Sequence, residues 1–253
     1  MSDLTRAFET VVVTEDGRDQ NAADLPLEAP LRMEVNGVHL ATLMRLPGND
    51  RELALGFWLT EGLITGRDDI VTMEHCPDDP NLLRLRLTGD VPDGPPMAIG
   101  TACGGILGRE MPEALSLQGP VVAAEVLMSL RGLLEQNQPI RERAGGVHAA
   151  AILAPDGRLV VAHEDIGRHN ALDKVIGHCV LRGDTLADKI VLLTGRHTAE
   201  MVLKLARAGI GLACSMTTPS SLGVELADRL GVTLVARLRR DRFEVFSHPE
   251  RIA

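Results

Sequence analysis

Residues 163–174 read His163-Glu164-Asp165-Ile166-Gly167-Arg168-His169-Asn170-Ala171-Leu172-Asp173-Lys174. This polar stretch follows an apolar segment at 159–162 and leads into a helix expected over about 168–181. Polar groups between a strand and a helix lie where α/β proteins bind ligands. The helix start also offers unpaired N–H groups and a positive dipole end, which suit an anion. The sequence leaves open an ordinary helix start with surface ion pairs, each worth about 0–1 kcal/mol.

The residues that surround this stretch predict alternating strands and helices. Strands at 147–153 and 158–162 flank the turn Pro155-Asp156-Gly157, and the continuous apolar runs at 190–193 and 210–214 are typical of strands buried on both faces. Helices are expected over 198–208 and from Ser220 to Leu230. We therefore expect an α/β fold with a partly parallel sheet that is covered on both faces.

Two further junctions between a strand and a helix carry polar residues. One is Gly195-Arg196-His197-Thr198 and the other is Thr217-Thr218-Pro219-Ser220. Because parallel strands deliver such junctions to the same edge of a sheet, we expect both to converge with Glu164–Asn170 on one site.

The first half of the chain favours β-structure. Asn36-Gly37 between two apolar runs is a strong hairpin signal, because both central residues of a type I′ turn need positive φ. We also expect a short strand at Val11–Val13, a helix over 51–63 and a strand around 83–87. The segment rich in glycine and proline at 89–108 predicts a loop, so we expect a β-rich N-terminal part at 1–108 and an α/β domain at 109–253.

Composition excludes several classes of function. The 253-residue chain has a formal net charge of −9, no tyrosine and one tryptophan, which argues against nucleic acid as a partner. It has no apolar run near the roughly 20 residues that cross a bilayer and no apolar signal core, so we expect a cytoplasmic protein without a membrane partner. The four cysteines form no C-x-x-C pair, so neither a disulfide framework nor a tightly bound metal is expected.

Cys103 differs from the other cysteines. It lies among Gly100, Gly104, Gly105 and Gly108, where no core could use its side chain. A thiol on a glycine loop is accessible, and backbone N–H groups can stabilise its thiolate. Cys103 is therefore a candidate nucleophile or sulfur carrier, the alternative being an incidental exposed cysteine.

Four arginines lie within six residues at Arg237-Leu238-Arg239-Arg240-Asp241-Arg242. Arginine binds phosphate groups with two parallel hydrogen bonds. The segment is thus a candidate phosphate site, with a solvated hairpin turn as the alternative.

These residues resemble the FdhD family of accessory sulfurtransferases, which formate dehydrogenases require for activity. The likeness covers nearly the whole chain. It rests on the motif at 164–174 and on further matches, which are Val35-Asn36-Gly37, Glu52–Phe57 with Glu61-Gly62, Gly145–Ala150, Gly195-Arg196 and Pro249–Arg251.

The resemblance implies a cytidine-deaminase-like three-layer core, a smaller β-rich N-terminal part and a homodimer. It implies that a cysteine desulfurase loads sulfur on Cys103 as a persulfide. The sulfur would then pass to the molybdenum bis-guanine-dinucleotide cofactor (Mo-bisMGD) before its insertion into apo formate dehydrogenase. The family's cofactor loop corresponds to 237–242, where the guanine-nucleotide part of the cofactor would bind. As a separate hypothesis, six further residues would shape the site and steady the sulfur or the pyrophosphate, namely Glu164, Asp165, Arg168, His169, Asp173 and Arg196.

The chain departs from the family pattern in two places. Ile106 replaces the second cysteine of a C-G-x-C-G loop, so a mechanism that needs a cysteine pair is not available, although one cysteine can still form and discharge a persulfide. Arg237 and Asp241 replace an aromatic residue and a glycine, and a carboxylate is unfavourable beside a pyrophosphate unless it is paired.

Two rival functions remain open. The missing second cysteine leaves room for a chaperone that binds the cofactor and apo formate dehydrogenase without moving sulfur. A zinc deaminase would need a nearby Glu and a P-C-x-x-C motif. His148-Ala149-Ala150 supplies no Glu, and the chain has no P-C-x-x-C.

Overall fold

The computed structural model describes residues 4–89, 97–99 and 116–253 of the chain. Cys103 and Ile106 therefore lie outside the described residues. Helices and strands alternate through the second half, and a mixed α/β fold is observed, as expected. None of the helices in the described ranges is long and apolar enough to cross a membrane.

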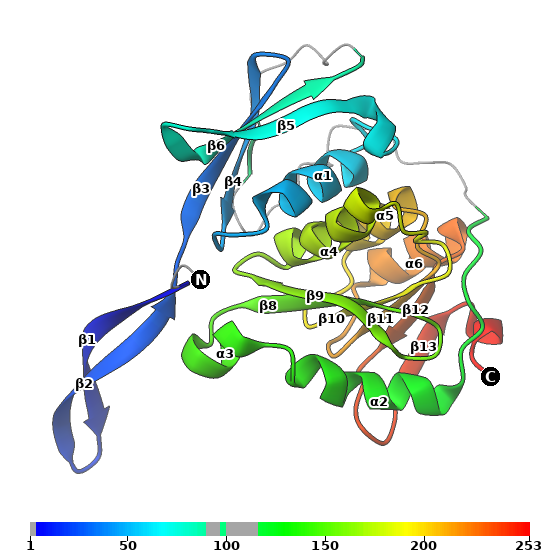
Figure 1. Cartoon of the computed structure of the whole chain (residues 1–253). Coiled ribbons are helices and arrows are strands. Elements are labelled where there is room, and N and C mark those ends of the chain that lie inside the picture. The colour runs from blue at the N-terminus through cyan, green and yellow to red at the C-terminus, as the bar shows by residue number, and fades with distance from the viewer. Residues whose placement is uncertain (1–3, 90–96, 100–115) are drawn as a thin grey trace.

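The first part of the chain forms a two-stranded ribbon and a five-stranded sheet (Figure 1). The ribbon pairs β1 with β2 antiparallel, and the sheet has the order β5-β6-β3-β4-β7. The hairpin predicted at Asn36-Gly37 is confirmed, with φ of 50° and 84° at its two residues. The strands are β1 (Thr5–Thr14), β2 (Gly17–Pro26), β3 (Ala29–Val35), β4 (Val38–Arg45), β5 (Ile70–Cys76), β6 (Asp79–Leu87) and β7 (Met97–Ile99).

The second sheet has six strands in the order β13-β12-β11-β10-β8-β9. β10, β11 and β12 run parallel, whereas β8, β9 and β13 pair antiparallel with their neighbours. The expected partly parallel sheet is thus present. Its strands are β8 (His148–Leu153), β9 (Leu159–Asp165), β10 (Ile190–Leu193), β11 (Leu212–Ser215), β12 (Thr233–Ala236) and β13 (Glu244–Ser247).

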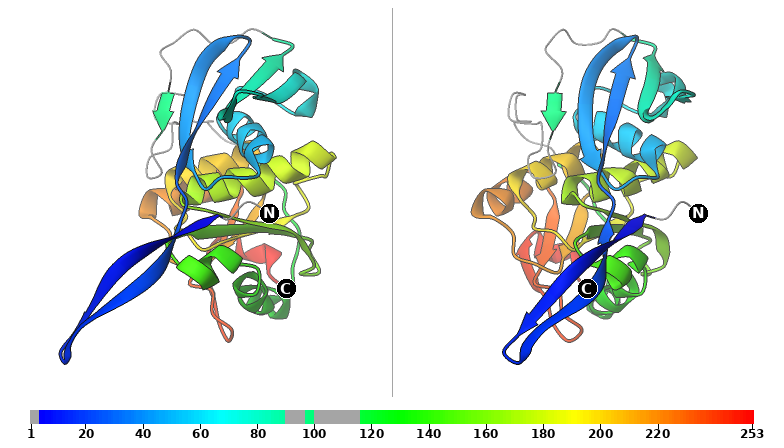
Figure 2. Two further views of the ribbon diagram at one scale, coloured as in Figure 1. Left: turned by 60° about the vertical axis from the view of Figure 1, so that its left-hand side comes forward. Right: turned by 90° about the vertical axis from the view of Figure 1, so that its left-hand side faces the viewer.

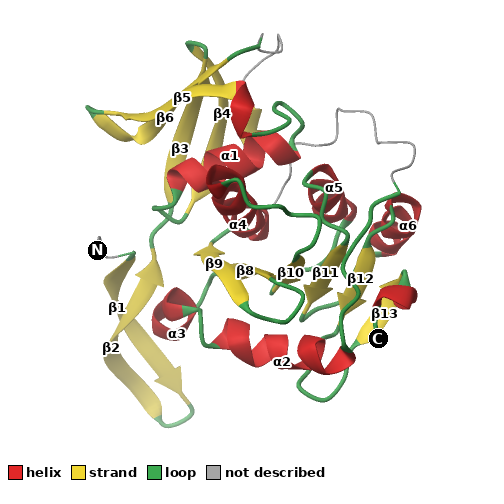
Figure 3. Cartoon of the chain, turned by 45° about the vertical axis from the view of Figure 1, so that its right-hand side comes forward, coloured by secondary structure: helices red, strands yellow, loops and turns green. Residues whose placement is uncertain are grey.

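Helices cover both faces of this sheet and complete three layers (Figure 3). α2 packs on one face through a core of Leu127, Leu130 and Leu134. α4, α5 and α6 pack on the other face, and α1 lies between them and the five-stranded sheet. The expected likeness to cytidine deaminases stays a prediction. The helices are α1 (Asp50–Thr60), α2 (Ala124–Glu135), α3 (Pro139–Ala144), α4 (Arg168–Arg182), α5 (Ala199–Arg207) and α6 (Ser221–Leu230), with 3₁₀ turns at Arg67–Asp69 and Pro249–Arg251.

The two parts of the chain meet where α1 crosses α4. A Cβ atom on Gly56 would lie 1.9 Å from the carbonyl oxygen of Asp173, and one on Gly177 would lie 1.8 Å from that of Glu52. Only glycine permits so close an approach of two backbones. One hydrophobic core therefore runs from the five-stranded sheet through this crossing to the face of the second sheet.

The last residues of the chain fasten the segment that leads into α2. Arg251 donates hydrogen bonds to the carbonyl oxygens of Gly211, Gly231 and Leu117, at 3.1, 2.7 and 2.7 Å. Ala253 exchanges backbone hydrogen bonds with Val122 and Ala124.

The sequence missed β2, β5, α3 and most of β1, and it also missed β7 (Met97–Ile99), which lies within the segment 89–108 that was predicted as a loop. Only Val11–Val13 was expected as a strand in the first 24 residues, but β1 and β2 are each ten residues long. Both faces of this ribbon are largely exposed, so it lacks the alternation that identifies a half-buried strand. β5 and α3 were missed for the same reason, because neither shows a clear alternation of buried and exposed residues. β5 is mostly exposed, and α3 is only six residues long.

Candidate functional site

A groove rich in arginine lies at the carboxyl ends of β10, β11 and β12. It consists of two adjoining cavities of about 370 and 400 Å³ that share Arg131, Glu135 and Arg239. We call it the arginine groove. Its other lining residues are Gln138, Arg141, Thr194, Met216, Thr217, Arg240, Asp241 and Arg242.

The strand ends place the floor of the groove. Thr194 follows β10 directly, and its hydroxyl group accepts a hydrogen bond from the backbone N–H of Ala149 at 2.9 Å. Ser215 ends β11 and donates to the carbonyl oxygen of Gly195 at 2.7 Å. The backbone N–H of Thr217 donates to the hydroxyl oxygen of Ser215 at 3.0 Å. These bonds hold Thr194 and Thr217 side by side at the sheet edge.

The groove carries more positive than negative charge. Glu135 lies 2.8 Å from Arg131 and 3.1 Å from Arg240. The hydrogen bond from Arg131, and then that from Arg240, lower the pKa of Glu135. Two acids, Glu135 and Asp241, therefore face five arginines among the lining residues, which are Arg131, Arg141, Arg239, Arg240 and Arg242. Such a surplus of guanidinium groups suits a phosphate or pyrophosphate ligand.

The six residues of the predicted cofactor segment do not all face the groove. Arg239 and Arg242 close a turn, with the N–H of Arg239 bonded to the carbonyl oxygen of Arg242 at 2.8 Å. The Arg239 guanidinium donates to the carbonyl oxygen of Met216 at 2.8 Å. Leu238 is buried in the core beneath α2, and Arg237 pairs with Glu244 of β13 at 2.9 Å. The groove thus receives the side chains of Arg239, Arg240, Asp241 and Arg242 from this segment.

The three junctions are neighbours at this edge of the sheet, although of their residues only Thr217 lines the arginine groove, and a single shared site stays a prediction. Arg168 packs so closely on Gly195 that a Cβ atom there would lie 2.9 Å from the Cβ of Arg168. The backbone N–H of Ser220 bonds to the carbonyl oxygen of His197 at 3.0 Å. Arg196 is exposed on the same loop as Gly195.

His148 adjoins the groove through Thr194. Its Nδ1 atom lies 3.4 Å from the hydroxyl oxygen of Thr194, which lines the groove. Burial, followed by the charges of Arg168 and Arg141, lowers the pKa of His148. The imidazole is therefore a neutral hydrogen-bonding group next to two guanidinium groups.

The two acids at the end of β9, Glu164 and Asp165, bind groups of the protein itself through hydrogen bonds and an ion pair. Glu164 accepts hydrogen bonds from the N–H groups of Ile140 and Arg141, at 2.8 and 2.9 Å, and so fixes the first turn of α3. Asp165 is 2.8 Å from Lys174 and also accepts from the N–H groups of Leu46 and Gly167. These contacts position the wall of the groove at Arg141 and tie the β4–α1 loop to the second sheet.

Asp173 and His169 are also enclosed. Asp173 contacts Lys204 at 2.9 Å and Thr60 at 2.8 Å, which joins α4 to α5 and α1. Nε2 of His169 lies 3.3 Å from a carboxylate oxygen of Glu200. Burial lowers the pKa of His169 to about 3, with the charges of Lys204, Arg168 and His148 adding to this, so the imidazole is neutral.

The sequence did not identify the opposite wall of the groove. This wall comes from α2, α3 and the short link between them, which supply Arg131, Glu135, Gln138 and Arg141. The pattern of polar residues on a predicted helix does not indicate which edge of a sheet the helix will pack against. The spacing of Arg131 and Glu135 by four residues predicts only that the two side chains meet.

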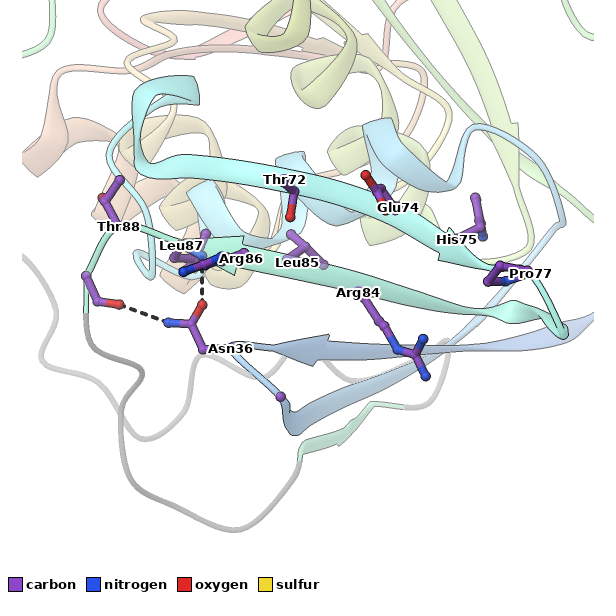
Figure 4. A pocket seen from close by; sticks show the side chains of 12 residues that line it. Asn36, Thr72, Glu74, His75, Pro77, Arg84, Leu85, Arg86, Leu87 and Thr88 are labelled. Atoms are coloured by element: carbon purple, nitrogen blue, oxygen red, sulfur yellow. Dashed lines mark hydrogen bonds between the residues drawn. The ribbon is translucent and has the colours of Figure 1, made fainter.

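A separate cavity of about 680 Å³ lies over β5, β6 and the β3–β4 turn (Figure 4). The side-chain amide of Asn36 bonds there to the carbonyl oxygen of Gly89 and to the N–H of Leu87, at 3.1 and 2.8 Å. These bonds fasten the turn. In the described ranges no group of three or more His, Cys, Asp or Glu side chains is placed to hold a metal ion.

Residues 26–253 match the model of the FdhD/NarQ family. The chain belongs to the FdhD/NarQ family. The resemblance inferred from its motifs is therefore confirmed. Curated relatives agree with the match. A protein named sulfur carrier protein FdhD from Anaeromyxobacter dehalogenans is 36% identical over 96% of this chain and 93% of its own length. The protein of the same name from Sulfolobus acidocaldarius is 37% identical over 94% and 95%.

A solved structure shows the same fold in another FdhD/NarQ relative. The crystal structure of a candidate formate dehydrogenase accessory protein from Desulfotalea psychrophila superposes with a TM-score of 0.82. The two chains are 31% identical, and the match covers 99% of this chain and 100% of the other. The likeness thus extends over both parts of the chain.

Proposed function

We propose that this FdhD/NarQ protein is a sulfur carrier in the maturation of a formate dehydrogenase. Cys103 takes sulfur from a cysteine desulfurase and passes it to Mo-bisMGD before that cofactor enters the apo-enzyme. The observation that carries the proposal is the arginine groove, whose guanidinium groups fit the pyrophosphate and guanine-nucleotide parts of such a substrate. The names of the relatives support the sulfur-transfer part.

The chemistry needs one cysteine. The thiolate of Cys103 attacks the outer sulfur of the desulfurase persulfide, the S–S bond breaks, and the desulfurase thiolate leaves. The acceptor then donates an electron pair to the outer sulfur on Cys103, the S–S bond breaks, and Cys103 returns as a thiolate, while the acceptor is oxidised by two electrons as it takes up the sulfur at the sulfide level. Ile106 in place of a second cysteine does not interrupt this sequence.

The groove and the three junctions supply the binding part. Arg239, Arg240 and Arg242 contact the phosphate groups of the nucleotide, while Arg131 offsets the charge of Glu135. Arg168, His169 and Arg196 shape the neighbouring sheet edge, and His148 and Thr194 join that edge to the groove. Glu164, Asp165 and Asp173 act from inside by holding α3, α4 and the β4–α1 loop in place.

Intact-protein mass spectrometry tests the sulfur-transfer step. After incubation with a cysteine desulfurase and cysteine, the parent should gain about 32 Da that a thiol releases, and Cys103→Ala should not. Cys76→Ala is the matched control, since Cys76 is only partly buried, and it should behave like the parent. A parent that gains no sulfur from an active desulfurase would support the rival function of a cofactor-binding chaperone.

Calorimetric titration with GDP tests the binding step separately. Arg239→Ala and Arg242→Ala should each weaken GDP binding by about tenfold or more, because each removes a charged hydrogen-bond donor. Arg237→Ala is the control within the same segment, since Arg237 pairs with Glu244 outside the groove. Arg168→Ala and Arg196→Ala test the sheet edge, and unchanged affinity in both would remove that edge from the binding site.

A further inference from the structure

The two cavities of the arginine groove differ in the residues that line them. The cavity of about 400 Å³ is lined by six described residues, all charged, which are Arg131, Glu135, Arg239, Arg240, Asp241 and Arg242. Figure 2 shows the loop between β12 and β13 beside α2, and this charged cavity lies between the two. The cavity of about 370 Å³ adds four uncharged residues, which are Gln138, Thr194, Met216 and Thr217. A ligand with one charged and one uncharged end would fit both cavities.

Gln138 brings an acceptor without a partner to the smaller cavity. The residue is 5% exposed, and its Nε2 atom donates to the carbonyl oxygen of Leu134 at 3.0 Å. This bond fixes the orientation of the side-chain amide, because a flipped amide would set one oxygen against another. Oε1 is buried and has no hydrogen-bond partner in the described ranges. A buried acceptor without a partner is unfavourable, so Oε1 is suited to accept a hydrogen bond from a ligand.

The backbone that follows Gln138 offers no donor to this oxygen. Pro139 has no N–H group. The N–H groups of Ile140 and Arg141 both donate to the carboxylate of Glu164, at 2.8 and 2.9 Å. A donor for Oε1 is therefore expected from the cavity itself.

Thr217 presents a second uncharged acceptor to the same cavity. The single hydroxyl proton of Ser215 is donated to the carbonyl oxygen of Gly195 at 2.7 Å. In the contact of 2.9 Å between the two hydroxyl groups, Thr217 is therefore the donor and Ser215 the acceptor. The Thr217 hydroxyl has no proton left for a ligand and can only accept from one. Acceptors repel the oxygens of a phosphate and favour a group that carries N–H donors.

We propose that Gln138 recognises the base of the nucleotide, with Oε1 accepting a hydrogen bond from an N–H group on the Watson–Crick edge of guanine. Guanine carries N1–H and a 2-amino group on that edge, whereas adenine has an acceptor at N1 and no amino group at C2. Met216 gives the base an apolar and polarisable surface in the smaller cavity. The arginines of the β12–β13 loop hold the phosphate groups in the larger cavity. This inference rests on the proposed function, since it assigns a specificity-determining residue within the same groove.

Calorimetric titrations with GDP, ADP and inorganic pyrophosphate test the role of Gln138. The parent should bind GDP at least tenfold more tightly than ADP, because a site built around a hydrogen bond rejects a ligand that cannot make it. Gln138→Met keeps the length of the side chain and removes Oε1. It should weaken GDP binding about tenfold and leave the affinities for ADP and pyrophosphate unchanged.

Asn137→Leu is the matched control. Asn137 donates to the carbonyl oxygen of Leu133 at 2.8 Å, as Gln138 does to Leu134, but it lines a separate cavity. The variant thus loses the same kind of bond to the end of α2 and should keep the parent's preference for GDP. If Gln138→Met loses GDP and ADP affinity by the same factor, its role is structural and the inference fails.

Pyrophosphate binding separates the failure of this inference from that of the proposed function. A parent that binds neither pyrophosphate nor GDP would overturn the proposed function, and the inference with it. Unchanged GDP affinity in Gln138→Met, with pyrophosphate still bound, would overturn the inference alone.

Thr217→Val decides the matter if Gln138→Met does not fold. It removes the second acceptor of the smaller cavity and should lower the preference for GDP over ADP without affecting pyrophosphate. Thr218→Val is its control, since Thr218 is exposed and lies outside the residues that line the groove. Equal preference for GDP in both threonine variants and the parent would show that the smaller cavity does not hold the base.

Discussion

At the scale of single residues, the central motif acts mainly from inside the protein. Lys204 is almost fully buried, and its ammonium group lies 2.9 Å from Asp173 and 3.2 Å from Glu61. Burial outweighs these contacts for Asp173 and raises its pKa to about 6, so the charged carboxylate depends on Lys204. Lys204 is thus the cation that keeps two buried acids in place.

Lys204→Met should lower the free energy of unfolding by about 3–5 kcal/mol, since it removes the cation that contacts the buried carboxylate of Asp173. Asp173→Asn should cost less, because Lys204 keeps its contact with Glu61. Urea denaturation at pH 7 measures both. A larger loss for Asp173→Asn than for Lys204→Met would contradict this view of the cluster.

His163 should make stability depend on pH. Burial, with a further contribution from Lys174 and His178 against the opposing charge of Glu52, lowers its pKa from 6.5 to about 4. The neutral ring therefore contributes stability above pH 6.5 that is lost as the pH falls towards 4. His163→Gln should reduce the slope of unfolding free energy against pH in this window by up to about 1.4 kcal/mol per pH unit. Equal slopes for parent and variant in urea titrations would refute the assignment.

At the scale of elements, the helix crossing explains two glycines that the sequence could not interpret. Gly56→Ala should lower the free energy of unfolding by about 3 kcal/mol, because its Cβ would overlap the backbone of Asp173 in α4. Gly132→Ala in α2 is the matched control. Nothing lies within 4 Å of its Cβ position, so it should stabilise the protein by about 0.5–1 kcal/mol. Thermal or urea unfolding measures both, and similar effects would mean that the crossing relaxes.

The spacing of apolar residues in the sequence predicted those helices and strands in which buried positions recur regularly or form a continuous run. β10 and β11 are continuous apolar runs, and α4 begins at Arg168 as expected. Turn chemistry gave the hairpin at Asn36-Gly37. The ribbon, β5 and α3 escaped detection because their residues are mostly exposed. For the site, the strand ends predicted which junctions meet, whereas the wall formed by Arg131 and Arg141 depends on how α2 and α3 pack, which no local pattern encodes.

At the scale of the whole molecule, one hydrophobic core links both parts of the chain. The domain boundary expected at residue 108 stays a prediction. Trp58, the only tryptophan, is fully buried in α1 within the first part, whereas most of the helical residues lie in the second. Urea unfolding followed by tryptophan fluorescence and by far-UV circular dichroism should therefore give coincident transitions. Two separated midpoints would show instead that residues 1–108 unfold as a domain of their own.

Arg251 and Ala253 fix residues 117–124 by hydrogen bonds, and these bonds matter for proteolysis. That segment leads directly into α2, and α2 forms one wall of the arginine groove. A protease that cuts before Arg251 would separate its guanidinium group from the chain and release the start of α2. Loss of nucleotide affinity in cleaved preparations would then report this cut and not a damaged binding site.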